Sequence, residues 1–194
     1  MSIASDGPSP SLRADAARNV AQIRQAAIAA FHGRGLDTPL EEIAAAAGVA
    51  KGTIYHRFGG RLGLIDAVIG ELVGVEMEEI ADRARGIDDP WDSLAHYIAE
   101  RRALFYREPA AVDALIVAYP ESRQLAAVAR SASKAATELI GRARDASVLR
   151  QDFTTEDLYY ADVGNALALR RLPKPALEDY NRRTQVFIDG LRAR

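Results

Sequence analysis

The sequence contains no cysteine among its 194 residues. A disulfide framework, a zinc finger and a thiol nucleophile are therefore excluded. The three histidines, His32, His56 and His96, are far apart, and none has a partner at the spacing of a metal pair on one helical turn. We expect neither a bound metal nor a cofactor.

Neither sign of charge dominates the chain. The formal net charge is −2 at pH 7, and the first sixty residues hold six Lys and Arg against five Asp and Glu. A globally basic field, the usual footprint of nucleic-acid binding, is thus missing. Specific DNA binding is still compatible with this balance, because it needs only a few phosphate contacts on one face.

Long apolar runs are also missing. No stretch approaches the roughly eighteen consecutive apolar residues of a membrane-spanning helix. The first residues lack the basic segment and following apolar run of a secretion signal. We therefore expect no membrane association and a cytoplasmic location.

Local catalytic motifs are absent from the sequence. It has no Gly-x-Ser-x-Gly and no phosphate-cradling glycine loop. The adjacent acids at 78–79 and 88–89 are typical of solvated surface rather than of an acid/base pair. We expect no enzyme, although catalytic residues brought together only by the fold are left open as an alternative.

The most specific pattern in the chain lies at residues 36–61, LDTPLEEIAAAAGVAKGTIYHRFGGR. Thr38 stands three residues before Glu41 with Pro39 between them, which predicts a capped helix that begins at Pro39. Apolar residues then recur at i, i+3, i+4 and i+7 until Gly48, which can adopt a positive φ and end the helix. A second short helix follows, with Ile54 pointing inward, and the two together form a helix-turn-helix pattern.

Residues on the outer surface of this pattern have the chemistry of DNA contacts. Lys and Arg can neutralise phosphates, while Thr, Tyr and His can donate hydrogen bonds to phosphate oxygens or base edges. Gly52 allows close backbone approach. The residues that we expect at the DNA interface are Thr38, Lys51, Gly52, Thr53, Tyr55, His56, Arg57 and Arg61.

This segment resembles the DNA-binding region of TetR-family transcriptional regulators. The recurring signature of that family stands here as Ile43-Ala44, Ala47-Gly48-Val49 and the run from Gly52 to Phe58, GTIYHRF. The resemblance covers roughly residues 15 to 65 strongly and the remainder only in helical layout. The chain departs from the family at Gly59 and Gly60, where a basic or proline-containing turn is usual, and Arg61 takes the place of the usual basic phosphate contact.

Helical periodicity continues through the rest of the chain, without strand alternation. We predict an all-α protein of about nine helices, in which a three-helix helix-turn-helix head is joined to a larger helical domain. The predicted divisions are a disordered leader at 1–13, a DNA-binding domain at 14–61, and an effector-binding and dimerisation domain at 62–194.

The resemblance implies that the last two helices form a four-helix interface between two subunits. Small and apolar residues in those helices fit this expectation: Ala161, Gly164, Ala168, Phe187 and Leu191. Packing within one subunit is the alternative. Aromatic residues in the middle helices predict an effector pocket, with a plain hydrophobic core as the alternative: Trp91, Tyr97, Phe105, Tyr119 and Tyr159.

Asp162 and Asn165 lie one turn apart in an otherwise apolar helix. If these side chains are buried, they require hydrogen-bond partners, either across a dimer interface or on an effector.

The function that we predict is a dimeric repressor that leaves a pseudo-palindromic double-stranded DNA operator when an unidentified small-molecule effector binds. Repression rests on the resemblance alone. The alternatives are an all-helical interaction module or a cofactor-independent enzyme, in either of which the helix-turn-helix would serve only for packing.

Overall fold

The structure, a computed structural model, describes residues 10–116 and 119–193. Helices account for nearly all regular structure in these ranges, and one isolated antiparallel bridge joins Leu149 to Arg192. The helices are α1 (Pro10–Arg34), α2 (Leu40–Ala46), α3 (Lys51–Phe58), α4 (Arg61–Ile69), the π-helical turn η1 (Gly70–Gly74), α5 (Val75–Arg85), α6 (Pro90–Arg107), α7 (Pro109–Ile116), α8 (Arg123–Asp145), α9 (Thr155–Arg171) and α10 (Leu177–Asp189).

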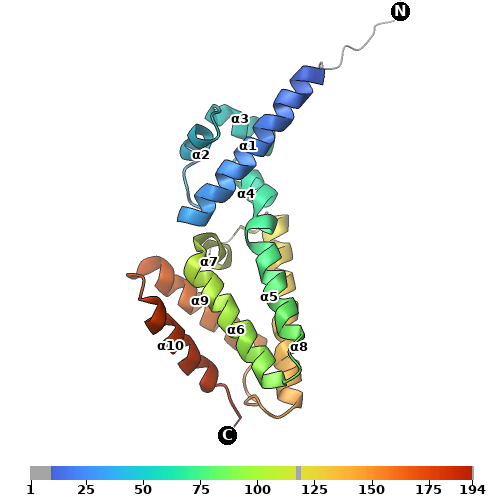
Figure 1. Ribbon diagram of the computed structural model, residues 1–194, viewed down its shortest axis with the longest axis vertical. Coiled ribbons are helices and arrows are strands. Elements are labelled where there is room, and N and C mark those ends of the chain that lie inside the picture. Colours follow the sequence, from blue (N-terminus) through green and yellow to red (C-terminus); the bar gives the residue numbers. More distant parts are fainter. Residues whose placement is uncertain (1–9, 117–118, 194) are drawn as a thin grey trace, which may run out of the picture.

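Because α4, η1 and α5 follow one another without a break, the described ranges contain nine helices in space, and the predicted all-α class is confirmed. Figure 1 shows an elongated molecule in which α1, α2 and α3 form a head at one end and α5 to α10 form a larger body. The α4–η1–α5 helix runs from the head into the body. We use "head" for α1–α3 and "body" for α5–α10.

One hydrophobic cluster runs through both parts. In the head, Ile23, Ala27 and Phe31 of α1 recur at spacings of four, so they share one face of the helix, and they are buried in a cluster with Ile43 and Ile54. The cluster continues through α4 into the body, so the head has no separate core. Burial of this continuous apolar surface fixes the head onto the connecting helix.

Two helices of the body begin with side-chain caps. The side chain of Asp89 accepts a hydrogen bond from the backbone N–H of Asp92 at 2.8 Å, with Pro90 at the first helical position. Thr154 and Asp157 form a reciprocal capping box at the start of α9. These caps fix where α6 and α9 begin.

The predicted cap of α2 is wrong. The helix begins at Leu40, Pro39 is extended, and no side chain caps the helix. The Thr38 side chain is turned inward, is only 3% exposed, and donates to the carbonyl oxygen of Gly35 at 2.8 Å. Thr38 therefore satisfies the C-terminal end of α1, whose last carbonyls lack helical partners, rather than the first N–H groups of α2.

The first helix begins inside the predicted leader at 1–13. It runs from Pro10 to Arg34 and is followed by Gly35 with a φ of 87°. The other residues of the predicted leader, 1–9, lie outside the described ranges. Within those ranges no helix combines the length and apolar character needed to cross a bilayer.

The far end of the body holds the single tryptophan of the chain. Trp91, in the first turn of α6, is buried, and the guanidinium carbon of Arg192 lies 4.5 Å from the centre of its ring. This cation–π contact, together with the bridge between Leu149 and Arg192, holds the C-terminal segment against the body.

Candidate nucleic-acid interface and ligand cavity

The second helix of the helix-turn-helix, α3, presents most of its polar side chains to solvent. Ile54 faces the core, whereas Lys51, Gly52, Tyr55, His56 and Arg57 are exposed and Thr53 is partly exposed. The turn before α3 contains Gly48 at a φ of 67°, and α3 ends at Gly59 in the left-handed conformation. Gly48 lets α2 and α3 meet in a short turn, Gly59 ends α3, and α3 keeps one free polar face.

Lys51 and Tyr55 are one turn apart on that free face. The ammonium of Lys51 lies 5.6 Å from the centre of the Tyr55 ring and forms an ion pair with Glu41 of α2. This pair raises the pKa of Lys51 and lowers the pKa of Glu41, and both groups are solvent-exposed. Because an exposed pair contributes little free energy, a phosphate oxygen could replace Glu41 as the partner of Lys51.

Two of the predicted DNA contacts are engaged inside the protein. The guanidinium Nη1 of Arg61 donates to the carbonyl oxygens of Leu36 and Thr38 at 2.6 and 2.8 Å. Arg61 thereby ties the segment before α2 to the start of α4. Thr38 is too buried to reach a nucleic acid directly, so its contribution is to position α2.

The head meets the body at a buried carboxylate that the sequence analysis did not single out. Asp113 of α7 is fully buried, and its Oδ2 accepts the backbone N–H of Leu36 at 2.8 Å. Its Oδ1 lies 3.0 Å from Nε of Arg170, which also contacts Asp37 at 3.2 Å. Burial raises the pKa of Asp113, while the Leu36 hydrogen bond and Arg170 oppose this. Gly35 has no room for a side chain here, because a Cβ would overlap the Asp113 carboxylate.

A second acid at the start of α7 reinforces this junction. Glu108 is buried, accepts the backbone N–H of Ala110 at 3.2 Å, and pairs with His32 near the end of α1. Burial raises its pKa, opposed by these two contacts. Two carboxylates, one just before α7 and one within it, thus hold the end of α1 and the segment that follows it.

The opposite side of α7 lines a cavity in the body. The larger chamber, about 510 Å³, lies among α6, α7, α8 and α9, and an adjoining chamber of about 70 Å³ extends toward the connecting helix at Val73 and Met77. Both chambers share the same four lining residues, which makes them parts of one space: Arg101, Leu115, Ala129 and Ala132. This volume falls within the ordinary range of small-molecule sites.

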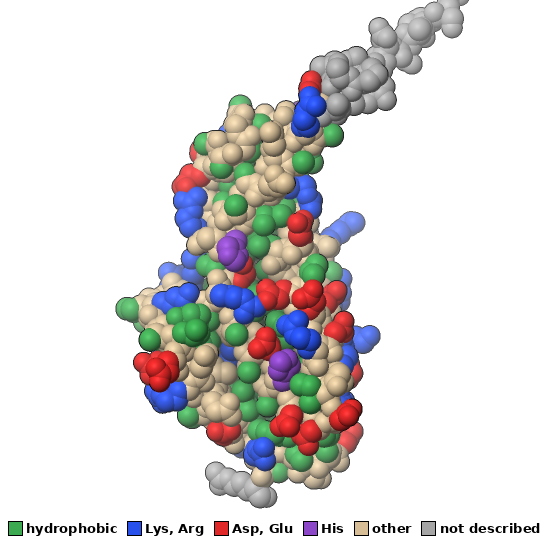
Figure 2. Space-filling model, viewed as in Figure 1, with side chains coloured by type: hydrophobic (Ala, Val, Ile, Leu, Met, Phe, Trp, Pro, Cys, Tyr) green, Lys and Arg blue, Asp and Glu red, His purple; other side chains and the backbone are tan. Residues whose placement is uncertain are grey.

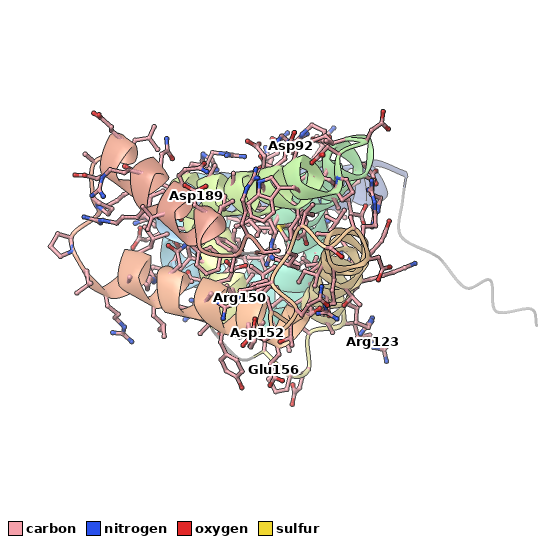
Figure 3. All side chains as sticks on the ribbon, turned by 90° about the horizontal axis from the view of Figure 1, so that it is seen from below. Asp92, Arg123, Arg150, Asp152, Glu156 and Asp189 are labelled. Carbon is pink, nitrogen blue, oxygen red and sulfur yellow. The ribbon has the colours of Figure 1, made fainter. Side chains whose placement is uncertain are left out.

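The outer part of the larger chamber is formed by the first turn of α9. Thr155, Glu156 and Tyr159 line it there, and Figure 3 shows Glu156 at the periphery of the body, beyond the α8–α9 connection that carries Arg150 and Asp152. The chamber therefore faces solvent at the start of α9, where Glu156 and Tyr159 are exposed, and Arg101 is a buried member of its lining.

The five predicted pocket aromatics separate in the structure. Phe105 lines the smaller chamber and Tyr159 the larger one. Trp91 and Tyr97 are buried core residues outside both sets of lining residues, and Tyr97 donates to the carbonyl oxygen of Ala132 at 3.0 Å. Tyr119 is half-buried, packs against the core, and has its pKa raised by burial. The alternative of a plain core therefore describes Trp91 and Tyr97.

Asp162 is buried and pairs within its own chain. Its carboxylate lies between two adjacent arginines of α6, 2.9 Å from Nη2 of Arg101 and 3.6 Å from Nε of Arg102. Burial raises the pKa of Asp162, opposed by both arginines. Neither predicted partner, a second subunit or an effector, is needed to explain its presence.

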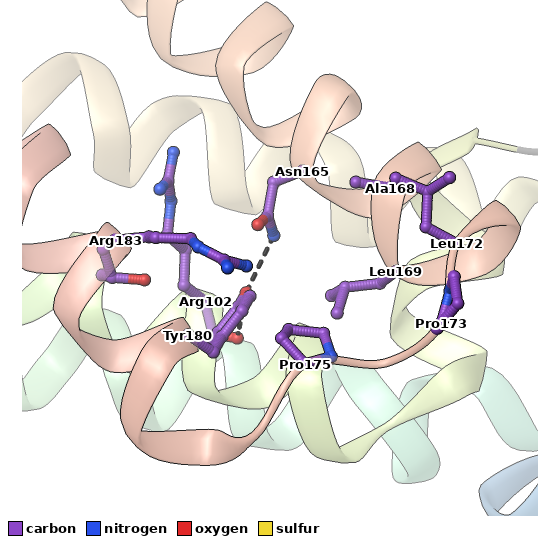
Figure 4. A pocket seen from close by; sticks show the side chains of 10 residues that line it. Arg102, Asn165, Ala168, Leu169, Leu172, Pro173, Pro175, Tyr180 and Arg183 are labelled. Carbon is purple, nitrogen blue, oxygen red and sulfur yellow. Dashed lines mark hydrogen bonds between the residues drawn. The ribbon is translucent and has the colours of Figure 1, made fainter.

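Asn165, one turn further along α9, belongs to a hydrogen-bond chain between helices. Its Nδ2 donates to the Tyr180 hydroxyl at 2.8 Å, and that hydroxyl donates to the carbonyl oxygen of Arg102 at 2.9 Å. Figure 4 shows these groups around a small cavity among α6, α9 and α10, whose volume is about 160 Å³. This space is smaller than the sites that usually enclose a drug-sized ligand.

The outer face of α9 and α10 carries apolar side chains without cover from the chain itself. Tyr160 and Leu167 are exposed on the same side of α9 as Gly164 and Ala168, and Val186 is exposed on α10. Figure 2 shows apolar side chains at the surface near the turn between α9 and α10, beside acidic and basic side chains on the same edge of the body.

The residues predicted for a dimer interface fall into two groups. Gly164 and Ala168 are exposed, and Ala161 is half-buried. Leu191 is buried in the core of its own chain, so its side chain is unavailable to a partner. Phe187 is half-buried between the Phe153 ring, 6.5 Å away between centres, and the guanidinium of Arg102, 4.0 Å from the ring centre.

Comparison with known proteins adds independent information. Residues 23–68 match the family model described as "Bacterial regulatory proteins, tetR family". No curated protein sequence matches the chain at a significant level.

Solved structures extend the similarity over almost the whole chain. The TetR transcription regulatory protein from Mycobacterium vanbaalenii is 26% identical, with a TM-score of 0.53, over 94% of this chain and 99% of that one. The TetR transcriptional regulator SCO0520 from Streptomyces coelicolor is 26% identical, with a TM-score of 0.54, over 89% and 98%. AibR in complex with isovaleryl coenzyme A and operator DNA shares the fold, with a TM-score of 0.66 and 16% identity over 90% and 97%.

Proposed function

We propose that this chain, which belongs to the TetR family of bacterial transcriptional regulators, is a dimeric repressor that leaves its operator when a small molecule occupies the cavity of the body. Family membership makes it a DNA-binding regulator of transcription rather than an enzyme. Repression, dimerisation and effector release are the parts that we propose. The observation that indicates which residues bind DNA is the exposed polar face of α3.

In this proposal, α3 enters the major groove and Lys51, Gly52, Thr53, Tyr55, His56 and Arg57 face the DNA. Lys51 and Arg57 neutralise phosphates, and Thr53 reads a base edge. Arg61 and Thr38 act indirectly, because their hydrogen bonds hold the segment that leads into α2.

Replacement of Lys51 with alanine should weaken DNA binding on every sequence. The substitution removes one phosphate contact, so the slope of log affinity against log salt should fall by about one. Fluorescence anisotropy at several salt concentrations, with the DNA flanking the coding region and an unrelated duplex as competitor, measures both quantities. Glu41→Gln is the matched control, because it removes the ion-pair partner of Lys51 but keeps the cation, and its affinity should not fall.

Thr53→Ala tests whether Thr53 contacts a base, in contrast to Lys51, which we expect to contact a phosphate. This variant should lose affinity for the operator but not for unrelated DNA, by roughly 1–3 kcal/mol for one base contact. Equal losses on both duplexes would remove Thr53 from the base-reading group. An unchanged salt slope for Lys51→Ala would show that α3 does not face the phosphates.

We propose that the exposed apolar face of α9 and α10 is the dimer interface. Gly164 and Ala168 leave space for close approach of a second helix, and Leu167 and Val186 supply apolar area. A two-fold pair of heads is also what two operator half-sites require.

Leu167→Asp should convert the protein to a monomer and reduce operator affinity. Leu167 is 44% exposed in the isolated chain, so the substitution should leave the fold of each subunit intact while it places a charge in the interface. Sedimentation equilibrium gives the oligomeric state. Val75→Asp is the control, because Val75 is 53% exposed and belongs to α5, which lies on the other side of the body from α10. If both variants remain dimers, the interface lies elsewhere.

The effector is proposed to act through α7 and the connecting helix. Ala111, Ala114 and Leu115 of α7 line the cavity. Asp113 of the same helix holds Leu36, just after α1, and Glu108, which immediately precedes α7, holds His32 of α1. Val73 and Met77 bring the α4–η1–α5 helix to the same space. A ligand that favours one position of these helices changes the position of the head, and DNA must then weaken ligand binding by the same factor.

A further inference from the structure

The cluster formed by Arg101, Arg102 and Asp162 has more positive than negative charge. Two guanidinium groups share one carboxylate, and all three side chains are nearly buried, with exposures of 8%, 8% and 1%. Every salt bridge that either arginine makes among the described residues is to Asp162. Nε of Arg101 and of Arg102 are buried without hydrogen-bond partners in that part of the chain. A buried cation without a full counter-charge is costly, so this arrangement favours an additional anion.

The two arginines face different spaces. Arg102 lines the small cavity beside Tyr180, whereas Arg101 lines both chambers of the large cavity. The rings of Tyr97 and Phe105 lie 5.1 and 5.7 Å from the guanidinium carbon of Arg101. These rings attract a cation, but they bring no net negative charge to neutralise it. Arg101 therefore presents part of the cluster's excess positive charge to the large cavity, where an anion from outside could reach it.

We infer that the large cavity binds an organic monocarboxylate, whose ionised carboxylate lies against Arg101 and whose apolar body fills the chamber toward α9. This inference rests on the proposed function in that it takes the cavity to be the effector site. The guanidinium is planar and can donate two parallel hydrogen bonds to a carboxylate, which makes Arg101 the specificity-determining residue.

The remaining walls fit the body of such a ligand. Leu115, Ala129, Ala132, Ala136 and Leu158 supply apolar surface, and hydroxyl groups occur farther out, at Ser133, Thr137 and Thr155. A multiply charged phosphate would meet a single arginine, and the carboxylate of Glu156, which lines the outer part of the chamber, would repel it more strongly than it repels a monocarboxylate held at the inner end. An acyl thioester would place a neutral group beside Arg101 and leave the excess charge uncompensated, so the free acid should bind better than its coenzyme A thioester.

Calorimetric titration of the full-length protein at neutral pH tests the inference. The probes are decanoate and 4-phenylbutyrate, their matched alcohols decan-1-ol and 4-phenylbutan-1-ol, and decanoyl coenzyme A. The unsubstituted protein should bind each acid roughly 10- to 100-fold more tightly than its alcohol, as expected for hydrogen bonds to a charged group. Decanoyl coenzyme A should bind more weakly than decanoate.

Variants locate this preference at Arg101. Arg101→Met should abolish the difference between acid and alcohol and leave the alcohol affinity nearly unchanged, which a purely structural role of Arg101 would not produce. Arg101→Gln is a second neutral variant in case the first does not fold, and Arg101→Lys should keep part of the preference because it keeps the charge. Arg183→Met removes an exposed arginine from the small cavity and should change nothing.

Several outcomes would overturn the inference. These are equal binding of acids and alcohols, no binding of any acid, tighter binding of the thioester than of the free acid, and an acid preference that survives in both neutral variants. Operator affinity measured in the same titrations separates this inference from the proposed function. If acids bind through Arg101 without changing operator affinity, the carboxylate site is supported and the effector role of the cavity is contradicted. If acids and alcohols release the operator equally well, the effector role is supported and the carboxylate site is contradicted.

Discussion

Asp162→Ala should lower the free energy of unfolding by about 3–5 kcal/mol, because it leaves two buried arginines side by side without a carboxylate. In the native chain, Asp162 lies within 4 Å of both guanidinium groups. Its removal therefore adds repulsion between like charges to the loss of an ion pair. Chemical denaturation at constant pH measures the change, and the slope with denaturant tests whether unfolding is still two-state.

The matched control removes a positive charge from the same cluster. Arg101→Met leaves Asp162 beside Arg102, one carboxylate with one guanidinium, and should cost much less than Asp162→Ala. A double substitution, Arg101→Met with Asp162→Ala, should be more stable than Asp162→Ala alone, because one of the two uncompensated cations is gone. If Asp162→Ala costs less than about 1 kcal/mol, the cluster is not the charge-imbalanced element described above.

Among single glycine-to-alanine substitutions in the connecting helix, Gly63→Ala should lower the free energy of unfolding most. A Cβ on Gly63 would overlap the backbone carbonyl oxygen of Phe58 and lie 2.9 Å from its carbonyl carbon. Phe58 ends α3, so relief of this overlap requires α3 and α4 to move apart. We expect a loss of about 3 kcal/mol, the upper end of the usual range for overpacking. Denaturation and operator anisotropy should both report the change, since α3 carries the proposed DNA contacts.

Gly141→Ala in α8 is the control for this prediction. No atom lies within 4 Å of a Cβ at Gly141, which is inside a helix. Alanine at this position should raise stability by about 0.5–1 kcal/mol through its greater helix propensity. Equal effects of the two substitutions would mean that α3 and α4 can separate freely at their junction.

The helical architecture could be predicted from the sequence because periodicity and caps are local. The apolar spacing in α1, the Asp89 and Thr154 caps, and the Gly48 turn all depend on residues a few positions apart, and the structure has them. The cap predicted for α2 was wrong because a local pattern does not determine which of several partners a side chain takes. Thr38 had two possible partners, and the tertiary position of α1 decided between them.

The charged groups at the head–body junction and in the cavity could not be predicted in the same way. Asp113 receives the N–H of Leu36 across 77 residues of sequence, and Asp162 meets Arg101 from another helix. A signal was nevertheless present. Arg101 falls on the apolar stripe of α6 with Tyr97 and Phe105, and Asp113 interrupts the otherwise apolar helix α7. A charged residue at a core position is a reason to look for a partner or a ligand.

The position of Trp91 determines what the intrinsic fluorescence of this protein reports. The only tryptophan lies in the first turn of α6, at the end of the body opposite the head, with Arg192 over its ring. Displacement of the C-terminal segment would change the surroundings of the indole directly, whereas a rearrangement confined to α3 would leave them unchanged. The native emission spectrum therefore reports locally on how the C-terminal segment packs against the body. A fluorescent label added to the head could be observed at the same time, and the two signals would report on different parts of the structure.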